Sequence, residues 1–385
     1  MKDTKFMQMA LKMAQRGIGS VEPNPAVGAV IVKANQIIGK GWHKKFGGPH
    51  AEINALEDCK TLGVNPQGAT MYVTLEPCCH QGKTPPCTDA IIAAKLAKVV
   101  VAMIDPSEHA SGRGIEQLRN AGIAVETGVC EKEAKLLNAP FIKFVTTGRC
   151  WTILKWAQTI DGKMAYANSG HGTRVTGHEH RWISNEVSRK DVHKLRHRAD
   201  AVLVGINTVI ADDPLLTGRS NGDKALIRIV LDNKLRIPLE SKLLDTAQKM
   251  PVLIVTAEGA VQSNLEKVDK ITSKGAELLT VPAAYVGSNL HFLLDELSKR
   301  GIWQLLVEGG PTVLASFLKE ELADEIRIYI APKILGSQGN ADIAGQMAKM
   351  TSAIGLHNVD IKHFGDDVCI TGLTQKALAE IGIAD

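Results

Sequence analysis

The chain carries HAE at residues 50–52 and EPCCHQGKTPPC at residues 76–87. These two stretches contain the imidazole of His50 and the two proline-preceded thiols of Cys78 and Cys87. One histidine and two cysteines can supply three ligands to zinc, which leaves the fourth tetrahedral position open for water. A structural zinc site is closed by four protein ligands, so a set of three favours a catalytic metal centre.

Glu52 stands two residues after the histidine and is the candidate acid and base beside that water. A single carboxylate within hydrogen-bond reach of water and substrate can carry the proton transfers that removal of an amine requires. A His-x-Glu element followed by paired cysteines is typical of zinc-dependent deaminases, which remove an exocyclic amine from a base-like ring. The pattern therefore predicts such an enzyme in this part of the chain.

The three candidate ligands are expected near the ends of regular elements. His50 follows a Gly-Gly-Pro break and opens a predicted helix, Cys78 follows a predicted strand, and Cys87 precedes a second predicted helix. Two thiolates neutralise the charge of a zinc ion and make a bound water less acidic. Helix dipoles and backbone N–H groups that point at the thiolates offset part of this effect.

The length and composition of the chain indicate two globular domains. At 385 residues it is long for one domain, and 44% hydrophobic with 22% charged residues is ordinary for a protein with more than one core. The net charge of +4 is small for this length, and no cluster of Lys and Arg suggests a nucleic-acid partner. We predict that the first domain covers residues 1–147 and the second residues 148–385.

The seven cysteines are not spaced as a disulfide framework, which favours a reducing compartment. Charged residues interrupt the N-terminal stretch where the apolar part of a signal peptide would lie. The longest apolar stretch, residues 91–104, is too short to cross a membrane and is broken by two lysines. We therefore expect a cytoplasmic protein with no membrane partner.

Up to residue 138 the chain alternates between the apolar periods of helices and strands. Helices are predicted over 4–16, 50–60, 88–98 and 114–121, and strands over 27–33, 36–40, 70–75 and 98–104. Thr88 is predicted to cap the third of these helices. This alternation indicates a central sheet with helices on both faces.

Residues 138–150 are predicted to connect the first domain to a second α/β unit. Apolar runs typical of buried strands lie at 151–157, 201–205, 226–232, 252–256, 277–281, 303–308 and 325–331, and helices are predicted over 291–300 and 313–322. The fingerprint G-x-G-x-x-G is absent, which disfavours a common Rossmann domain. The turn GGPT at 309–312 joins a buried strand to a helix, an arrangement suited to binding an anion.

Eight residues separate Cys78 from Cys87, whereas two separate the cysteines of most cytidine- and tRNA-type deaminases. The motif P-C-x-H-x-G-x-T-P-P-C, together with PNPAVGAV at 23–30, GWH at 41–43 and GRG at 112–114, resembles the bifunctional deaminase/reductase family of riboflavin biosynthesis. The resemblance extends over essentially the whole chain. It implies a cytidine-deaminase-like three-layer α/β/α domain followed by a dihydrofolate-reductase-like α/β domain.

The resemblance also implies two consecutive reactions on a phosphorylated pyrimidine. The first domain would use Zn²⁺ to deaminate a diamino-ribosylamino-pyrimidinone 5′-phosphate. The second domain would use NADPH to reduce the ribosyl group of the product to a ribityl chain. At the level of the family we expect a homo-oligomer, either a dimer or a tetramer, without a nucleic-acid partner.

Site residues follow from matched positions in the family. His50, Cys78 and Cys87 resemble the zinc ligands, and Glu52 resembles the proton donor. The residues expected to touch the deaminase substrate are Asn24, His43 and His80.

In the second domain, segments such as KWA at 155–157, VGINTV at 204–209 and VEGG at 307–310 match the family. The residues expected to face the cofactor are Ala157, Trp182, Thr208, Asp212, Gly310, Pro311, Thr312, Val313, Leu314, Ala315 and Ser316. The residues expected to face the substrate are Arg196, Leu216, Arg219 and Glu308. A guanidinium fork suits a ribose phosphate, which gives the two arginines a chemical reason to be there.

The chain departs from the family pattern at three places. Ala26 stands where many relatives have asparagine, and the segment 105–109 differs from the usual Asp-Pro-Asn-Pro. The segment 168–178 is longer than expected and displaces the register around His180, which we leave out of the predicted site. No side chain stands out as a general acid for the reduction.

Two other interpretations share part of the pattern. A nucleic-acid base deaminase with an appended domain would also have His-x-Glu and Pro-Cys, but the cysteine spacing and the lack of a basic, aromatic-rich stretch disfavour it. A non-catalytic zinc protein would need a fourth protein ligand, for which Cys79 and His80 are the candidates.

Overall fold

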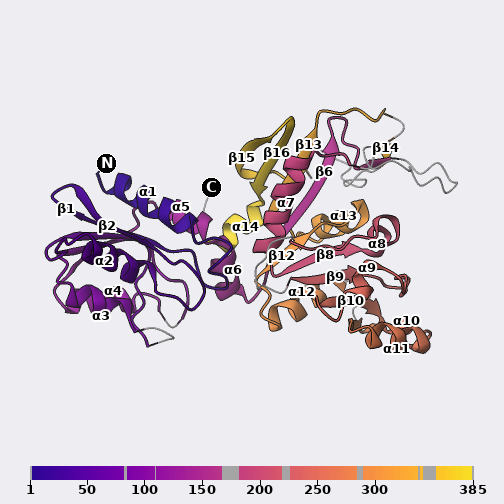
Figure 1. Ribbon diagram of the computed structural model, residues 1–385, viewed down its shortest axis with the longest axis horizontal. Helices are drawn as coiled ribbons and strands as arrows, with labels where there is room; N and C mark the ends of the chain where they lie inside the picture. The colour runs from indigo at the N-terminus through magenta and orange to yellow at the C-terminus, as the bar shows by residue number, and fades with distance from the viewer. Residues whose placement is uncertain are drawn as a thin grey trace. The chain divides into compact units, whose positions relative to one another are not determined.

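The computed structural model describes residues 2–81, 85–108, 110–166, 182–218, 226–283, 289–336, 339–340 and 353–383 (Figure 1). The chain forms two compact units, one made of Met1–Gly148 with Glu380–Asp385 and the other of Arg149–Ala379. The segment 168–178, His180 and Arg219, which the sequence singled out, lie outside the described residues. Within the described chain, no helix is both long and apolar enough to cross a lipid bilayer.

A five-stranded sheet with the order β2-β1-β3-β4-β5 forms the centre of the first unit. Its strands are β1 (Gly28–Lys33), β2 (Gln36–Trp42), β3 (Thr70–Leu75), β4 (Lys98–Met103) and β5 (Ala124–Thr127). β1 runs antiparallel to β2 and β3, whereas β3, β4 and β5 are parallel. The carboxyl ends of the parallel strands share one edge of the sheet, where ligands of open α/β sheets bind.

Helices cover both faces of this sheet. They are α1 (Lys2–Gln15), α2 (Ala51–Thr61), α3 (Cys87–Ala93), α4 (Arg113–Asn120), α5 (Glu131–Leu137) and α6 (Ala139–Thr147). Buried residues of α2, α3 and α4 share one core with Met71 and Val73 of β3. Phe6 of α1 contacts the ring of Tyr72, which points to the opposite face because side chains alternate along a strand. The three-layer arrangement predicted for the first domain is therefore confirmed.

The chain passes from the first unit to the second at residues 148–149, within the connection predicted over residues 138–150, but this connection also contains the helix α6. A proline in its first turn and Gly148 at its C-cap, with φ of 67°, are ordinary signals for the start and end of a helix. The last residues of the predicted second domain, by contrast, belong to the first unit. Lys143 of α6 forms an ion pair of 3.0 Å with Glu380, so the last residues pack in the first unit.

The helix predicted over residues 88–98 is shorter than expected, and Thr88 does not cap it. The helix α3 begins at Cys87 and has Pro86 at its N-cap. The Thr88 hydroxyl instead donates to the carbonyl oxygen of Cys78 at 3.3 Å and to Gln117 of α4 at 2.9 Å. Thr88 therefore joins three segments around the cysteines.

The second unit is built on a nine-stranded sheet with the order β11-β10-β9-β8-β12-β6-β13-β16-β15. Its strands are β6 (Trp151–Thr159), β8 (Ala201–Gly205), β9 (Ile227–Leu231), β10 (Val252–Ala257), β11 (Glu277–Val281), β12 (Gln304–Val307), β13 (Glu325–Ala331), β15 (His357–Phe364) and β16 (Asp367–Leu373). The first seven in the order are parallel, and β16 and β15 pair antiparallel. All seven predicted apolar runs are strands of this sheet. β7 (Ala165–Tyr166) and β14 (Gly339–Asn340) pair separately.

The helices of the second unit are α7 (Glu186–Arg198), α8 (Ile206–Asp212), α9 (Lys242–Asp245), α10 (Glu258–Gln262), α11 (Leu265–Ser273), α12 (Asn289–Lys299), α13 (Pro311–Lys319) and α14 (Gln375–Glu380). The main core joins the buried leucines of α12 and Phe317 of α13 to the sheet. On the other face, Val192 of α7 packs against Tyr329 and Cys369. The α/β class predicted for this half is confirmed.

One glycine sets the distance between α2 and the sheet. A Cβ placed on Gly41 of β2 would lie 2.2 Å from the carbonyl oxygen of Ala51 and 2.3 Å from the amide nitrogen of Ala55. Both atoms belong to the backbone of α2, so they cannot move aside alone. Because α2 begins directly after His50, this close approach also places the first candidate metal ligand.

We predict that Gly41→Ala destabilises the first unit by about 1–3 kcal/mol, because α2 must shift outward to admit the methyl group. Calorimetry of the full chain should show the transition of this unit lowered by roughly 4 °C or more. Gly259→Ala in α10 is the matched control, since a Cβ there meets nothing within 4 Å. Equal melting curves for the two variants would contradict this account of the packing.

Candidate active sites

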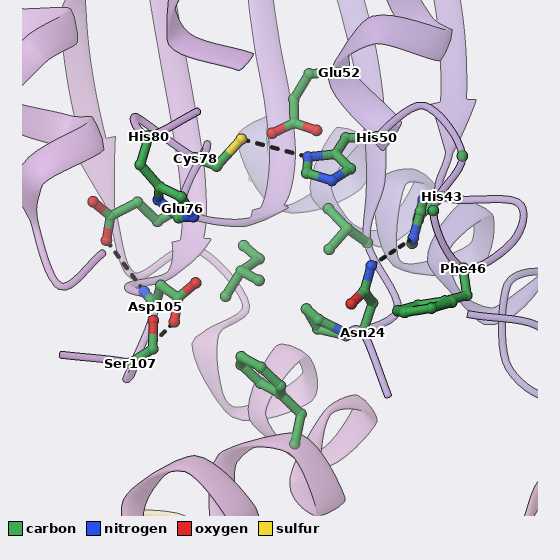
Figure 2. Close-up of a pocket in the computed structure, with 16 residues that line it drawn as sticks. Asn24, His43, Phe46, His50, Glu52, Glu76, Cys78, His80, Asp105 and Ser107 are labelled. Atoms are coloured by element: carbon green, nitrogen blue, oxygen red, sulfur yellow. Dashed lines mark hydrogen bonds between the residues drawn. The ribbon is translucent and has the colours of Figure 1, made fainter. Parts of the chain in front are cut away.

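The described residues of the first unit enclose a cavity of about 360 Å³ (Figure 2). The predicted site residues that line it are Asn24, His43, His50, Glu52, Cys78 and His80. These side chains come from segments that are far apart in the sequence, and the sheet edge brings them together. Cys87 is fully buried behind this lining.

The imidazole of His50 lies between the two predicted cysteine ligands. Its Nδ1 is 3.4 Å from the Sγ of Cys78 and 3.3 Å from the Sγ of Cys87. The three ligand atoms all lie within 4.8 Å of one another. A tetrahedral zinc ion with ordinary Zn–S and Zn–N bonds would hold nitrogen and sulfur roughly 3.6 Å apart, so the observed spacing fits such an ion.

A fourth protein ligand is not part of this cluster among the residues that the structure describes. Cys79 and His80, one of which a closed structural site would need as its fourth ligand, stand outside the cluster. The arrangement therefore has the three-ligand form of a catalytic site, with one position open toward the cavity.

Two of the three candidate ligands lie at the starts of helices. His50 is the N-cap residue of α2 in an extended conformation, and Cys87 is the first residue of α3. The backbone N–H of Cys87 donates to the Sγ of Cys78 at 3.4 Å. The expectation that a helix start points at a thiol is confirmed for α3 and Cys78, and this favours the negative charge of that thiol.

The pKa values of the two thiols are shifted in opposite directions. The hydrogen bond from Cys87 lowers the pKa of Cys78 to about 4, and the same bond raises the pKa of Cys87. Thiolates rather than thiols bind metals, so a metal ion would displace the remaining proton.

Glu52 lies in the first turn of α2, with 3% of its surface exposed. Its Oε2 has no hydrogen-bond partner among the described residues. Burial, with the neighbouring Cys78 thiolate as a second cause, raises the pKa of Glu52 to about 7. A buried carboxyl oxygen without a partner costs free energy, which a water or substrate hydrogen would relieve.

Asn24 and His43 lie together on one side of the cavity (Figure 2). The Nδ1 of His43 is 3.1 Å from the carbonyl oxygen of Pro49, which only accepts, so this nitrogen carries the proton. Burial lowers the pKa of His43, which favours the neutral ring. Its Nε2 then accepts from the Nδ2 of Asn24 at 3.2 Å. The amide of Asn24 is thereby oriented with its oxygen available to a ligand.

The opposite side of the cavity holds residues outside the predicted set of site residues (Figure 2). They are Glu76, Asp105 and Ser107. Phe46, which lies on the side of Asn24 and His43, and Phe141 also line the cavity. Asp105 follows β4, the parallel neighbour of β3, so its place after a strand at this edge was a usable signal. The aromatic residues had no comparable signal.

In the second unit, the predicted cofactor residues gather at the carboxyl ends of parallel strands. Thr208 and Asp212 lie in α8, directly after β8, and Gly310 is the N-cap residue of α13, after β12. A Cβ on Gly310 would lie 3.9 Å from the Oγ1 of Thr208, so the two turns are neighbours. The side chain of Leu314, however, lies in the core, so only its backbone can face a ligand.

Two predicted cofactor residues, Ala157 and Trp182, lie outside α8 and α13. Ala157 lies in β6, and Trp182 is 51% exposed. The backbone oxygen of Trp182 accepts from the Nζ of Lys333 at 3.0 Å, and the guanidinium of Arg189 lies 5.2 Å from its ring centre.

Two predicted substrate residues, Arg196 and Glu308, form a buried ion pair. The Nε and Nη2 of Arg196 donate to the two carboxylate oxygens at 2.5 and 3.0 Å. Lys155, which the sequence did not assign a role, lies 3.5 Å from the same carboxylate. The guanidinium of Arg196, which we expected to hold a phosphate, is therefore paired with Glu308. The Nη1 of Arg196 donates to the backbone oxygen of Thr217.

The charges in this cluster shift the titration of its members. Burial alone would raise the pKa of Glu308, but Arg196 and Lys155 outweigh it and hold the value at about 2. Burial lowers the pKa of Lys155.

Leu216, another predicted substrate residue, lies beside Thr217. It is buried and has a left-handed φ of 53°.

Family models match both halves of the chain. Residues 1–103 match the cytidine and deoxycytidylate deaminase zinc-binding region, and residues 150–370 match the RibD C-terminal domain. The protein is thus a deaminase with a zinc-binding region joined to a reductase. Zinc and NADPH are the cofactors of these two regions, as the resemblance implied.

Relatives that match almost the whole chain identify the family. The riboflavin biosynthesis protein RibD of Aquifex aeolicus is 44% identical over 369 residues, which cover 96% of this chain and 97% of that protein. RibD of Escherichia coli is 38% identical over 375 residues, which cover 96% and 99%. The chain belongs to the RibD family of riboflavin biosynthesis proteins. The nucleic-acid deaminase and the non-catalytic zinc protein are therefore wrong interpretations.

Solved structures agree with this assignment over both units. A structure of Acinetobacter baumannii RibD is 36% identical with a TM-score of 0.79 and covers 97% of this chain and 99% of that one. A deaminase/reductase from Thermotoga maritima is 35% identical with a TM-score of 0.77 and the same coverage.

The buried pair in the second unit predicts an acid-sensitive stability. The pKa of Glu308 is about 2 when folded, below its ordinary value of 4.5, so its contribution is present above pH 4.5 and is lost as the pH falls toward 2. Between about pH 5 and pH 3 the wild type should lose roughly 2 kcal/mol more than Glu308→Gln. Urea unfolding followed by tryptophan fluorescence measures this, since four of the five tryptophans belong to this unit.

Glu277→Gln is the control for this experiment. Glu277 pairs with Arg300 on the surface, where an ion pair contributes at most about 1 kcal/mol. Its pH dependence should follow that of the wild type. A wild-type slope equal to that of Glu308→Gln would show that the buried pair does not carry the effect.

Proposed function

We propose that the first unit deaminates a diaminohydroxyphosphoribosylaminopyrimidine and that the second unit reduces the ribosyl group of the resulting phosphoribosylaminouracil. The Thermotoga maritima relative bears the name of these two activities. The observation that carries the first half is the convergence of His50, Cys78 and Cys87 beside the cavity. The domains are taken as residues 1–147 and 148–385.

We assign the zinc ligands as the Nδ1 of His50 and the sulfurs of Cys78 and Cys87. The spacing of these atoms fits tetrahedral coordination, and the N–H of Cys87 supports the charge of the Cys78 thiolate. When bound there, zinc acts as a Lewis acid that lowers the pKa of a water ligand.

Glu52 is assigned as the group that moves protons. Its buried Oε2 lacks a partner in the described chain, and it lies on the helix that starts at His50. A carboxyl group so placed can take one proton from water and give it to a ring nitrogen, and then take the second proton from the hydroxyl group added to the ring and give it to the departing amine.

The cavity wall formed by Asn24 and His43 is assigned to recognition of the pyrimidine or its ribose. The hydrogen bond between these residues fixes the amide so that Oδ1 accepts from a ligand N–H or O–H. His80 lines the same cavity and is assigned to substrate contact.

In the second unit, NADPH is assigned to the edge formed by α8 and the start of α13. The cofactor set is Ala157, Trp182, Thr208, Asp212, Gly310, Pro311, Thr312, Val313, Leu314, Ala315 and Ser316. Arg196, Leu216, Arg219 and Glu308 are assigned to the substrate, and Lys155 joins them by its contact with Glu308. Because Arg196 is held by Glu308, Arg219 is the better candidate for the phosphate.

The partner is a small phosphorylated pyrimidine. We further propose an assembly of identical chains that acts in the cytoplasm. None of the seven cysteines forms a disulfide, which agrees with a reducing compartment. Light scattering on the full chain would determine the number of copies.

Replacing Glu52 by Gln should strongly reduce deamination without removing zinc. The amide keeps the shape of the side chain but cannot carry protons, so ammonia release should fall by about 100- to 10,000-fold. NADPH oxidation on the deaminated substrate should stay at the wild-type rate, because that chemistry belongs to the second unit. Deamination that survives with zinc retained would overturn the assigned mechanism.

Replacing Cys87 by Ser should remove zinc from the first unit. We expect about one zinc per wild-type chain and a loss in this variant, because the three-ligand site depends on each thiolate. Cys79→Ser is the matched control, since Cys79 adjoins Cys78 but lies outside the cluster. Metal analysis of the purified proteins measures both, and loss of zinc from Cys79→Ser would contradict the ligand assignment.

A further inference from the structure

Glu76 is a buried carboxylate that no part of the proposed chemistry uses. It follows β3 directly, stands two residues before Cys78 and has 4% of its surface exposed. Its two oxygens accept four backbone hydrogen bonds. Oε2 accepts from the N–H groups of Asp105 at 3.2 Å and Gly112 at 2.9 Å. Oε1 accepts from those of Gly114 at 2.9 Å and Ile115 at 3.3 Å.

These bonds join three parts of the first unit. Gly112 is the N-cap residue of α4, and Gly114 and Ile115 lie in its first turn. The carboxylate therefore caps α4 from a neighbouring strand, and its charge suits the positive end of that helix. A Cβ on Gly114 would lie 2.1 Å from the carbonyl oxygen of Pro77, so this turn is packed tightly on the segment that leads to Cys78.

The second consequence concerns the wall of the cavity (Figure 2). Asp105 and Ser107 both line it, and the N–H of Asp105 is held by Glu76. The Oδ1 of Asp105 in turn accepts from the N–H of Ser107 at 2.9 Å. The carboxylate of Glu76 thus links this wall to the segment that leads to Cys78.

A third contact connects α4 to the cysteine segment. Gln117 of α4 accepts from the hydroxyl of Thr88, which also donates to the carbonyl oxygen of Cys78. Gln117 also donates to Asp89 of α3 at 2.9 Å. The first turn of α3 is therefore fixed to Gln117 of α4 beside the ligands.

We propose that Glu76 is a positioning residue for deamination, which sets the Asp105–Ser107 wall at the distance from the metal centre that the substrate requires. The inference rests on the deaminase function proposed above. Glu76 touches neither substrate nor metal in this role, and it acts through the backbone groups that it holds. Its effect should therefore appear in substrate binding more than in the capacity to hold zinc.

Glutamine is the informative replacement, because the site needs an acceptor at both ends of the side chain. Each oxygen of Glu76 faces two N–H donors. An amide has only one acceptor end, so whichever way it is turned, its NH₂ group meets two backbone donors. The substitution removes two hydrogen bonds at nearly constant volume.

The experiment measures ammonia release by the full-length protein over a range of concentrations of the diaminopyrimidine phosphate. For Glu76→Gln we expect KM to rise by about tenfold or more, with a smaller fall in kcat and with zinc content unchanged. NADPH oxidation by the same preparation on the deaminated substrate should match the wild type. Glu116→Gln makes the same change on the exposed side of α4 and should leave KM unchanged.

Each other outcome overturns the proposal. An unchanged KM with a lower kcat would show that the variant only reduces the active fraction of the protein. Loss of zinc would show that Glu76 supports the metal-binding fold instead of the cavity wall. If the wild type itself releases no ammonia, the proposed deaminase function fails, and that result is distinct from a failure of the role assigned to Glu76.

Discussion

The approach of the His50 imidazole to two thiols is the contact on which the first unit depends. These three groups come from the start of α2, the segment after β3 and the start of α3, and their ligand atoms lie within 4.8 Å. Bringing two sulfurs and a nitrogen so close is costly unless a shared proton or a metal ion holds them. The N–H of Cys87 at the start of α3, Gly41 beneath α2 and the buried Glu76 all help to hold these segments in place.

In the second unit, a buried charged group is likewise stabilised by side chains from other elements, here in an ion pair. Glu308 follows β12 and would be unstable alone in its buried position, but Arg196 from α7 and Lys155 from β6 compensate its charge. Breaking such a pair leaves an uncompensated buried charge, which is strongly destabilising. Both candidate sites lie where parallel strands end, because the edge of a sheet lets several segments converge on one point.

The two units therefore share a design without sharing a sequence pattern. In each, buried charge at the sheet edge is balanced by groups from other elements, and the residues expected to contact substrate lie beside it. The orientation of Asn24 is one example of how neighbouring groups set a site. The neutral tautomer of His43 decides which end of the Asn24 amide faces the cavity. The backbone carbonyl of Pro49 sets this tautomer, and no sequence motif reveals that contact.

Much of this molecule could be read from the chain alone. The seven apolar runs of the second half are strands, and HAE with EPCCHQGKTPPC contains the three ligand candidates, because ligand type and spacing are local properties. The helix α6, the capping of α4 by Glu76 and the commitment of Arg196 to Glu308 were not evident. Tertiary structure decided these, since a side chain chooses its partner by distance in space, and residues 76 and 115 or 196 and 308 meet only once the sheets have formed.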